Sequence, residues 1–163
     1  MATSRSPTPP STKRLLQELK SIVEDPSPIL QSLSPASEAE ILHWEAVMKG
    51  FPGTAYEAGL WHLDILIPPS YPLAPPKITF TTPICHPNVD FKTGEICLDL
   101  LKTSWSPAYT LTSTLEAVHQ LLAYPEVDSP FNVDIATLLK SGDKIGGESL
   151  VRFWCAERRW GGG

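Results

Sequence analysis

The 163-residue chain has few cysteines, no long apolar run and no excess of positive charge. Its three cysteines, Cys85, Cys97 and Cys155, are irregularly spaced and form no Cys-x-x-Cys pair. Such a set is a poor basis for a disulfide framework or a zinc site. We therefore expect a protein of a reducing compartment that holds no metal.

Two other absences limit what the chain binds. No apolar segment reaches the roughly 18 residues that cross a bilayer, and the N-terminus lacks the apolar core of a signal peptide. The net charge of −5 argues against a broad nucleic-acid-binding face, which needs clustered Lys and Arg. The sequence therefore predicts a soluble protein that binds no nucleic acid and does not insert into a membrane, so any membrane association would depend on a partner.

Proline, by contrast, is abundant, and it separates the segments that show a periodic pattern. Residues 1–10 are rich in Ser, Thr and Pro and have no periodicity, which is typical of a disordered tail. The apolar residues that follow recur at helical spacing: Leu15, Leu16, Leu19, Ile22 and Val23. They predict a helix that is capped by Ser11 or Thr12 and ends at Asp25-Pro26.

Apolar and polar residues then alternate in three segments, 42–48, 61–67 and, more briefly, 78–80, which predicts strands. The short turns between the segments imply an antiparallel meander with one buried face.

Helical spacing returns after Pro107, where Leu111, Leu115, Val118 and Leu122 form one apolar stripe. Shorter helices are predicted over 133–140 and 150–159. The order of helix, meander and helices predicts a single α+β domain over residues 11–160, with 161–163 as a frayed end.

The most informative stretch is His86-Pro87-Asn88, with Cys97 nine residues after Asn88. An amide shortly before a lone cysteine suggests acyl transfer through a thioester, because the thiol can carry the acyl group while the amide stabilises the oxyanion. Asn88 also has a structural interpretation, in which it binds loop carbonyls and holds the cysteine in place. Both roles are compatible. Pro87 fixes the backbone here, and we expect His86 to brace the turn rather than act as a base.

From about residue 13 to residue 160 the chain resembles the ubiquitin-conjugating enzymes. The matching motifs occur in the family order: Lys13-Arg14, Glu18-Leu19, Trp44, Tyr71-Pro72, Pro75-Pro76-Lys77, His86-Pro87-Asn88, Ile96-Cys97-Leu98-Asp99, Trp105-Ser106-Pro107 and Pro125-x-x-Asp128-Ser129-Pro130. The resemblance implies the family's fold: an N-terminal helix, a four-stranded antiparallel meander and C-terminal helices. It also implies an acyltransferase that accepts ubiquitin on Cys97 from the ubiquitin-activating enzyme and passes it on with a RING ligase, without a metal or a bound cofactor.

One branch of the family fits better than the others. Residues 91–95 put one more residue between Asn88 and Cys97 than the family's common form has. Three further segments also resemble the peroxisomal branch, the peroxin that serves recycling of the matrix-protein import receptor: 132–135, 141–143 and 156–158. The resemblance implies a cytosolic enzyme that a membrane-anchoring peroxin recruits to the cytosolic face of the peroxisome.

In the family, an acidic or phosphorylatable residue opposite the cysteine orients the incoming lysine. The matching position here is Ser129, directly after Asp128. Either Asp128 serves instead, or phosphate on Ser129 supplies the charge; the structural alternative is a capped Asp-Ser-Pro turn. A weak lysine-orienting site would suit a cysteine substrate, which attacks as a thiolate, and the peroxisomal branch is associated with modifying a receptor cysteine.

The family resemblance also implies two partner surfaces, because some positions of this chain match residues with which the family binds its partners. The surface for the activating enzyme and the ligase comprises Lys13, Arg14, Leu73, Ser106, Pro107 and Ala108; the donor-ubiquitin face, on the solvent side of the central helix, comprises Ser113, Glu116 and Gln120. The family often has an apolar residue where Glu116 stands. We therefore expect that a ligase or an anchor must enforce the closed state with donor ubiquitin.

The main alternative to an enzyme is a scaffold of the same fold that only binds ubiquitin or a ligase. Such variants typically lack the cysteine, whereas Cys97 and Asn88 are both present. Unrelated thiol enzymes fit less well: a cysteine phosphatase needs an Arg where Thr103 stands, and a papain-like protease would have only His119 as its downstream base.

Overall fold

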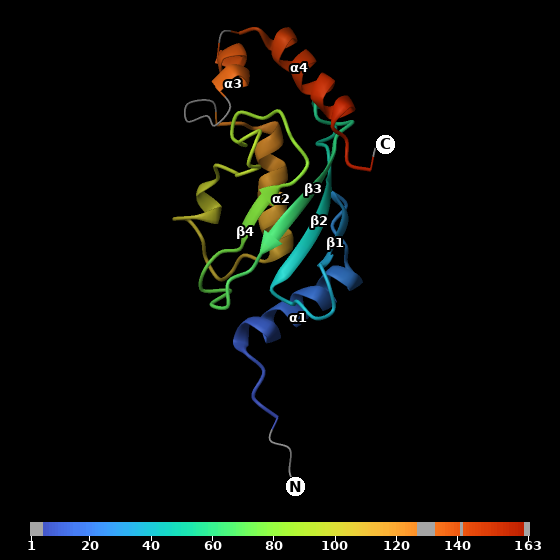
Figure 1. Cartoon of the computed structure of the whole chain (residues 1–163). Helices are drawn as coiled ribbons and strands as arrows, with labels where there is room; N and C mark the ends of the chain where they lie inside the picture. Colours follow the sequence, from blue (N-terminus) through green and yellow to red (C-terminus); the bar gives the residue numbers. More distant parts are fainter. Residues whose placement is uncertain (1–4, 127–132, 141, 162–163) are drawn as a thin grey trace.

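The computed structural model describes residues 5–126, 133–140 and 142–161. Its elements are α1 (Pro10–Glu24), β1 (Leu30–Pro35), β2 (His43–Lys49), β3 (Leu60–Leu66), β4 (Lys77–Phe80), the 3₁₀ helix η1 (Asp99–Leu101), α2 (Leu111–Ala123), α3 (Val133–Lys140) and α4 (Lys144–Glu157) (Figure 1). This order confirms the predicted α+β fold. No helix in the described ranges combines the length and the apolar character that crossing a bilayer needs.

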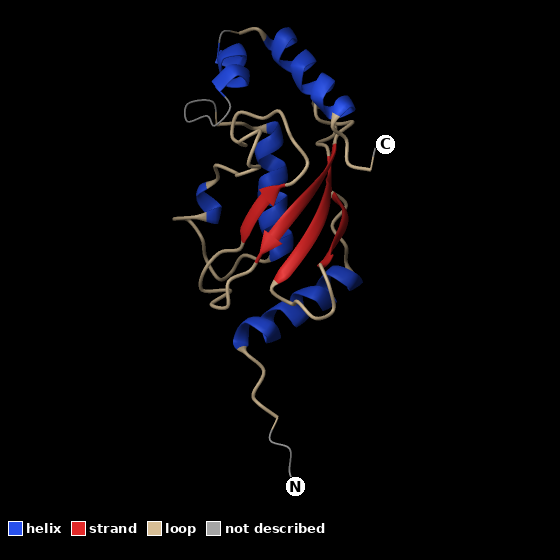
Figure 2. Cartoon of the chain, viewed as in Figure 1, coloured by secondary structure: helices blue, strands red, loops and turns tan. Residues whose placement is uncertain are grey.

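The four strands form one antiparallel sheet in sequence order, β1-β2-β3-β4 (Figure 2). The apolar residues of the predicted alternation face one another across it: Ala46 lies opposite Leu63, and Leu63 opposite Phe80. The four strands agree with the fold that the family resemblance implied, but the residue pattern alone did not locate β1, because only Leu33 of its six residues is buried. A sheet edge with one buried side chain leaves no alternation to detect.

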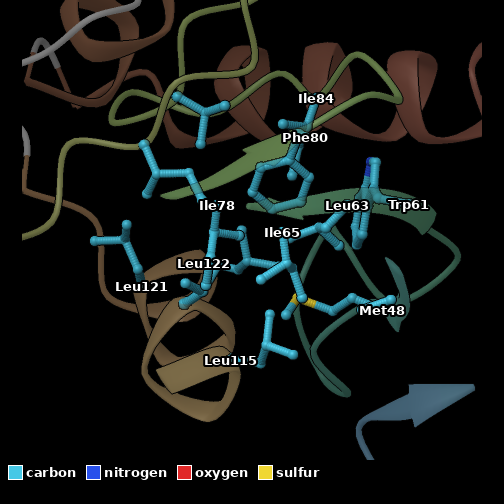
Figure 3. Packing of buried hydrophobic residues seen from close by; sticks show 14 of the residues in the cluster. Met48, Trp61, Leu63, Ile65, Ile78, Phe80, Ile84, Leu115, Leu121 and Leu122 are labelled. Carbon is cyan, nitrogen blue, oxygen red and sulfur yellow. The ribbon is translucent and has the colours of Figure 1, made fainter. Parts of the chain in front are cut away.

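Helix α2 covers the inner face of the sheet and closes the core (Figures 1 and 3). Leu115 and Leu122 lie close to Met48 and Ile65 in this packing (Figure 3). All four residues of the predicted α2 stripe are buried: Leu111, Leu115, Val118 and Leu122. The helix therefore supplies one side of the core and leaves its opposite face to solvent.

The start of α1 differs from the prediction. The helix begins at Pro10, Pro9 occupies the N-cap position, and among the described residues no side chain caps it, so the expected cap by Ser11 or Thr12 is wrong. Proline suits this place because it lacks the N–H that a helix start leaves unpaired, and its φ is already helical. Residues 5–9 are exposed and outside any helix or strand, and residues 1–4 of the predicted tail lie outside the described ranges.

Helix α4 begins six residues before the predicted start at residue 150. The side chain of Asp143 caps it by accepting the Gly146 N–H at 2.8 Å. Adjacent glycines, which are poor helix formers, hid this first turn from the sequence pattern. After α4, the N–H of Trp160 donates to the carbonyl of Leu60 at 2.8 Å, so the chain remains attached to the sheet up to residue 160. Residues 162–163 of the predicted frayed end lie outside the described ranges.

Candidate active site

Main-chain hydrogen bonds bring Cys97 beside Asn88. The N–H of Cys97 donates to the Asn88 carbonyl at 2.8 Å, and Val89 and Ile96 form an antiparallel bridge next to this pair. The loop between them folds back like a hairpin, so residues nine positions apart in sequence meet in space. The structure thus joins the two residues that the sequence predicts to form the acyl-transfer site.

A tight turn at residues 90–94 closes this loop. The Asp90 carboxylate accepts the N–H groups of Lys92 and Thr93, each at 2.9 Å, and these bonds hold the pKa of its carboxyl below the ordinary value. Gly94 has φ +73°, and a Cβ there would lie 1.8 Å from the carbonyl oxygen of Phe80. Position 94 therefore accepts only glycine without a shift of the backbone.

We expect the substitution Gly94→Ala to lower the free energy of unfolding by about 2–4 kcal/mol, because it adds a steric overlap to the strain of a positive φ. Urea unfolding of both proteins measures the loss. Gly53→Ala is the matched control, since Gly53 has φ +75° but open space around a Cβ; it should cost about 1 kcal/mol. Equal losses in the two variants would contradict a role for the close approach to Phe80.

The side chain of Asn88 is fully buried and pairs with the main chain of Glu126. Its Nδ2 donates to the Glu126 carbonyl at 2.6 Å, and its Oδ1 accepts the Glu126 N–H at 2.8 Å. The amide therefore fastens the segment after α2 to the loop that carries Cys97, as the structural interpretation requires. The oxyanion role of Asn88 stays a prediction. The predicted lysine-orienting residues, Asp128 and Ser129, lie outside the described ranges.

His86 is buried with both ring nitrogens in use. Nδ1 accepts the N–H of Asn88 at 3.0 Å, and Nε2 donates to the carbonyl of Leu121 at 2.8 Å, so these partners assign a neutral ring with its proton on Nε2. Burial lowers its pKa to about 4. A neutral ring with no free nitrogen fits the interpretation of His86 as a brace and leaves it unsuited to act as a base. Pro87, buried between His86 and Asn88, belongs to the same turn.

The lowered pKa of His86 makes the fold sensitive to acid. The unfolded chain takes up a proton near pH 6.5 and the native chain only near pH 4, so this contribution is complete above pH 6.5 and is lost as the pH falls toward 4. We expect the free energy of unfolding to drop by about 2 kcal/mol between pH 7 and pH 5, measured from urea midpoints. Burial also lowers the pKa of His119, which acts in the same direction, while Asp64 raises that of His43, which acts against it.

The variant His86→Gln separates this contribution from those of the other histidines. The free energy of unfolding of the variant should be lower than that of the wild type at pH 7. It should also change much less than the wild-type value between pH 7 and pH 5. If the variant retained the full pH dependence, His86 would not be its source.

The three cysteines differ in exposure. Cys85 and Cys155 are buried, and burial raises the pKa of each thiol to about 11, so both remain protonated at neutral pH. Cys97 is half-buried and free. Of the three, only Cys97 is placed to react with a second protein.

The predicted surface for the activating enzyme and ligase is formed by two adjacent loops. Leu73 is 79% exposed in the loop after Tyr71, and the indole Nε1 of Trp105 donates to the carbonyl of Pro72 at 2.8 Å. This bond ties the Leu73 loop to the segment 105–108, in which Ser106 is half-buried and Pro107 and Ala108 are exposed. Lys13 is exposed on α1. The structure therefore gathers the loop residues that the family resemblance groups together.

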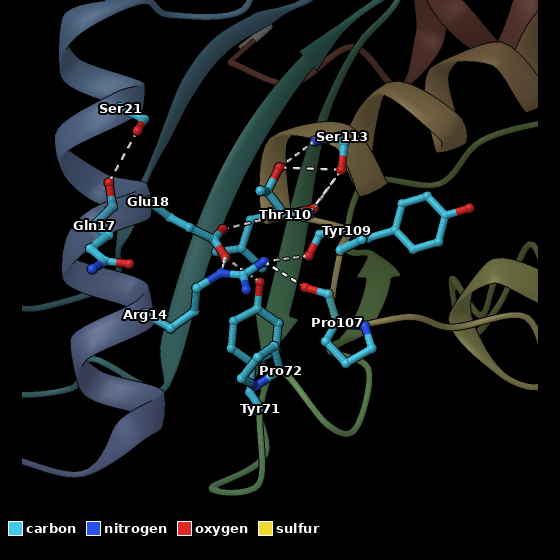
Figure 4. Close-up of polar contacts among 12 residues, drawn as sticks. Arg14, Gln17, Glu18, Ser21, Tyr71, Pro72, Pro107, Tyr109, Thr110 and Ser113 are labelled. Atoms are coloured by element: carbon cyan, nitrogen blue, oxygen red, sulfur yellow. Dashed lines mark hydrogen bonds and ion pairs between the residues drawn. The ribbon is translucent and has the colours of Figure 1, made fainter.

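Arg14 has intramolecular contacts that the sequence did not predict. Its Nη2 donates to the carbonyls of Pro107 and Tyr109, both at 2.9 Å, and its Nε donates to Glu18 at 2.8 Å (Figure 4). The guanidinium thus joins α1 to the loop before α2. Whatever contact Arg14 makes with a partner, it holds part of the predicted surface in place.

The residues of the predicted donor-ubiquitin face differ in exposure. Glu116 and Gln120 are exposed on α2, but Ser113 is half-buried. The Ser113 hydroxyl accepts the Thr110 N–H at 2.9 Å while Thr110 accepts the Ser113 N–H at 3.0 Å, a capping box. Ser113 therefore caps the start of the helix and is only partly exposed on the face that it shares with Glu116 and Gln120. The Glu116 carboxylate accepts a hydrogen bond from Ser27 at 3.1 Å.

Comparison with known proteins finds relatives that match most of this chain. The family model described as ubiquitin-conjugating enzyme matches residues 14–150. A Gibberella zeae protein named ubiquitin-conjugating enzyme E2 PEX4 is 48% identical over 159 residues, which cover 96% of this chain and 90% of that protein. Protein PEROXIN-4 of Arabidopsis thaliana is 44% identical over 146 residues, 88% of this chain and 92% of that protein.

A solved structure agrees with these matches. The crystal structure of the H. polymorpha ubiquitin conjugating enzyme Pex4p, in complex with the soluble domain of Pex22p, aligns with a TM-score of 0.85 and 40% identity, covering 91% of this chain and 98% of that one.

Proposed function

Since the chain belongs to the ubiquitin-conjugating enzymes, and within them to the peroxin-4 branch, we propose that it carries ubiquitin as a thioester on Cys97 and transfers it, with a RING ligase, to a substrate. The observation that carries the proposal is the pairing of Cys97, the one cysteine of three that is not buried, with the buried Asn88. A partly exposed thiol held by its main chain beside an amide is the arrangement that acyl transfer needs.

The chemistry runs in two exchanges. The Cys97 thiolate attacks the carbonyl carbon of the thioester that joins ubiquitin to the activating enzyme, and the thiolate of that enzyme leaves. The substrate nucleophile then attacks the new thioester, an oxyanion forms, and the bond to Cys97 breaks. Asn88 stabilises this oxyanion with an amide N–H, or holds the loops in register for the attack, or does both. ATP is consumed by the activating enzyme, so this chain needs no cofactor.

The substrate that we propose is the peroxisomal import receptor, modified for its recycling. The support is similarity to proteins named as peroxin-4 enzymes. We also propose that a membrane-anchoring peroxin comparable to Pex22p recruits the chain from the cytosol to the peroxisome, since the related H. polymorpha enzyme was solved with the soluble domain of that protein. A cysteine of the receptor is the acceptor that a weak lysine-orienting site would favour.

Charging of the purified chain tests the proposal. Incubation with ubiquitin, activating enzyme and ATP should give an adduct that survives on a non-reducing gel and disappears on a reducing one. The charged enzyme should then discharge faster to free cysteine than to free lysine at matched nucleophile concentration. Equal discharge rates to the two nucleophiles would contradict the preference for cysteine but not the proposed thioester on Cys97. No adduct at all would favour the second candidate, a non-catalytic scaffold that binds ubiquitin or a ligase.

A further inference from the structure

A buried carboxylate lies where three segments of the chain meet. Glu18 projects from α1 with only 5% of its side chain exposed. Its Oε1 accepts from the Arg14 Nε at 2.8 Å and from the Tyr71 hydroxyl, and its Oε2 accepts the N–H of Leu111 at 2.8 Å (Figure 4). Both carboxylate oxygens are therefore hydrogen-bonded, and the positive charge of the Arg14 guanidinium balances the buried negative charge of Glu18.

Each of these bonds leads to a different part of the predicted partner surface. Tyr71 begins the loop that exposes Leu73, and Leu111 begins α2, directly after the loop that contains Pro107. Arg14 extends the network from Glu18 to the carbonyls of Pro107 and Tyr109. The two loops are thus fixed to α1 through this carboxylate and the Arg14 guanidinium that it holds.

The Tyr71 hydroxyl acts as a donor throughout the neutral range. Burial, and then the neighbouring carboxylate of Glu18, raise its pKa well above the ordinary value. The hydroxyl keeps its proton and its bond to Glu18, so the direction of this contact does not change with pH near neutrality.

We propose that Glu18 is a positioning residue of the enzyme: its carboxylate sets the Leu73 loop and the segment 106–108 in one arrangement relative to α1, and so prepares the surface that the activating enzyme and the ligase bind. This inference rests on the proposed function, because it takes these loops as the binding surface. A surface that is already ordered loses less conformational entropy on binding, so its affinity is higher. A purely stabilising role would instead affect every step of the reaction alike.

The variant Glu18→Gln tests the proposal with little change in shape. Glutamine keeps one acceptor oxygen but turns an N–H₂ group toward donors, so it cannot serve Arg14, Tyr71 and Leu111 together. We expect the KM for this chain in charging by the activating enzyme to rise about tenfold, as the loss of charge-assisted hydrogen bonds suggests, with kcat within about twofold. Discharge of the purified thioester to free cysteine without a ligase should stay within about twofold of the wild type.

Glu24→Gln is the matched control. Glu24 lies on the same helix and forms an exposed ion pair with Lys20 at 3.9 Å, so the same chemical change there should leave both measurements unaltered. Tyr71→Phe is a second test variant, which removes one donor to Glu18 and keeps the ring. It should raise the same KM about threefold, again without slowing ligase-free discharge.

The possible results separate the two proposals. An unchanged KM in Glu18→Gln, or an equal loss in charging and in ligase-free discharge, would overturn the positioning role. If circular dichroism showed that Glu18→Gln does not fold, the KM of Tyr71→Phe would decide in the same way. A wild type that does not charge would overturn the proposed function itself, and the positioning role with it.

Discussion

Replacing Cys97 with alanine should abolish the ubiquitin adduct that forms with activating enzyme and ATP. The other two thiols cannot take over, because Cys85 and Cys155 are buried and burial raises the pKa of each to about 11. At neutral pH both remain protonated, and the thiol form is not a nucleophile. The expected result is therefore complete loss of the thiol-sensitive band on a non-reducing gel.

Two further variants make this result specific. Cys97→Ser should accept ubiquitin slowly as an oxygen ester, which survives treatment with a thiol, whereas Cys155→Ala should charge like the wild type. An adduct that persisted in Cys97→Ala and disappeared only when Cys85 was also replaced would move the acceptor site to Cys85. The assignment of Asn88 would then have to be reconsidered with it.

Replacing Asn88 with alanine should leave charging detectable but slow the discharge of the thioester to an added nucleophile by about 10²–10³-fold, the usual effect of removing an oxyanion donor. The substitution also removes both hydrogen bonds to the main chain of Glu126. We therefore expect a loss of about 1–3 kcal/mol in the free energy of unfolding as well. Single-turnover discharge and urea unfolding measure the two effects separately.

A variant that is destabilised without losing the amide separates the two roles of Asn88. Gly53→Ala, destabilised at a turn outside the 88–97 loop, controls for stability alone and should discharge at the wild-type rate. Discharge at the wild-type rate in Asn88→Ala would leave only the structural role.

The parts of the fold that the sequence predicted are those with a regular pattern of burial. Strands β2 and β3 alternate so clearly that partners such as Ala46 and Leu63 could be assigned to one face before their register was known. Strand β1 has a single buried residue, Leu33, and the first turn of α4 contains two glycines, so neither shows a pattern. The helix boundaries also depended on local capping: Asp143 caps α4, whereas Pro9 and Pro10 start α1 without a side-chain cap.

The site was predictable only in part, for a different reason. The pairing of Asn88 with Cys97 closes a short loop that sequence spacing can suggest. The bonds from Asn88 to Glu126 join residues 38 positions apart, and Glu126 contributes only its main chain, which has no signature in the sequence. Glu18 offered one signal, an acidic residue four positions after Arg14 on the apolar side of a helix, but the sequence does not show which groups it binds.

The topology of the chain also bears on the order in which the protein folds. Each strand of the sheet pairs with its neighbour in sequence, so the meander closes by successive short loops. Glu18 instead meets Tyr71 and Leu111, which are 53 and 93 residues away. Because the entropy cost of closing a loop grows with its length, this topology favours a nucleus in the meander and a late docking of α1. The predicted partner surface is then completed last, and a partly folded chain would not yet present it.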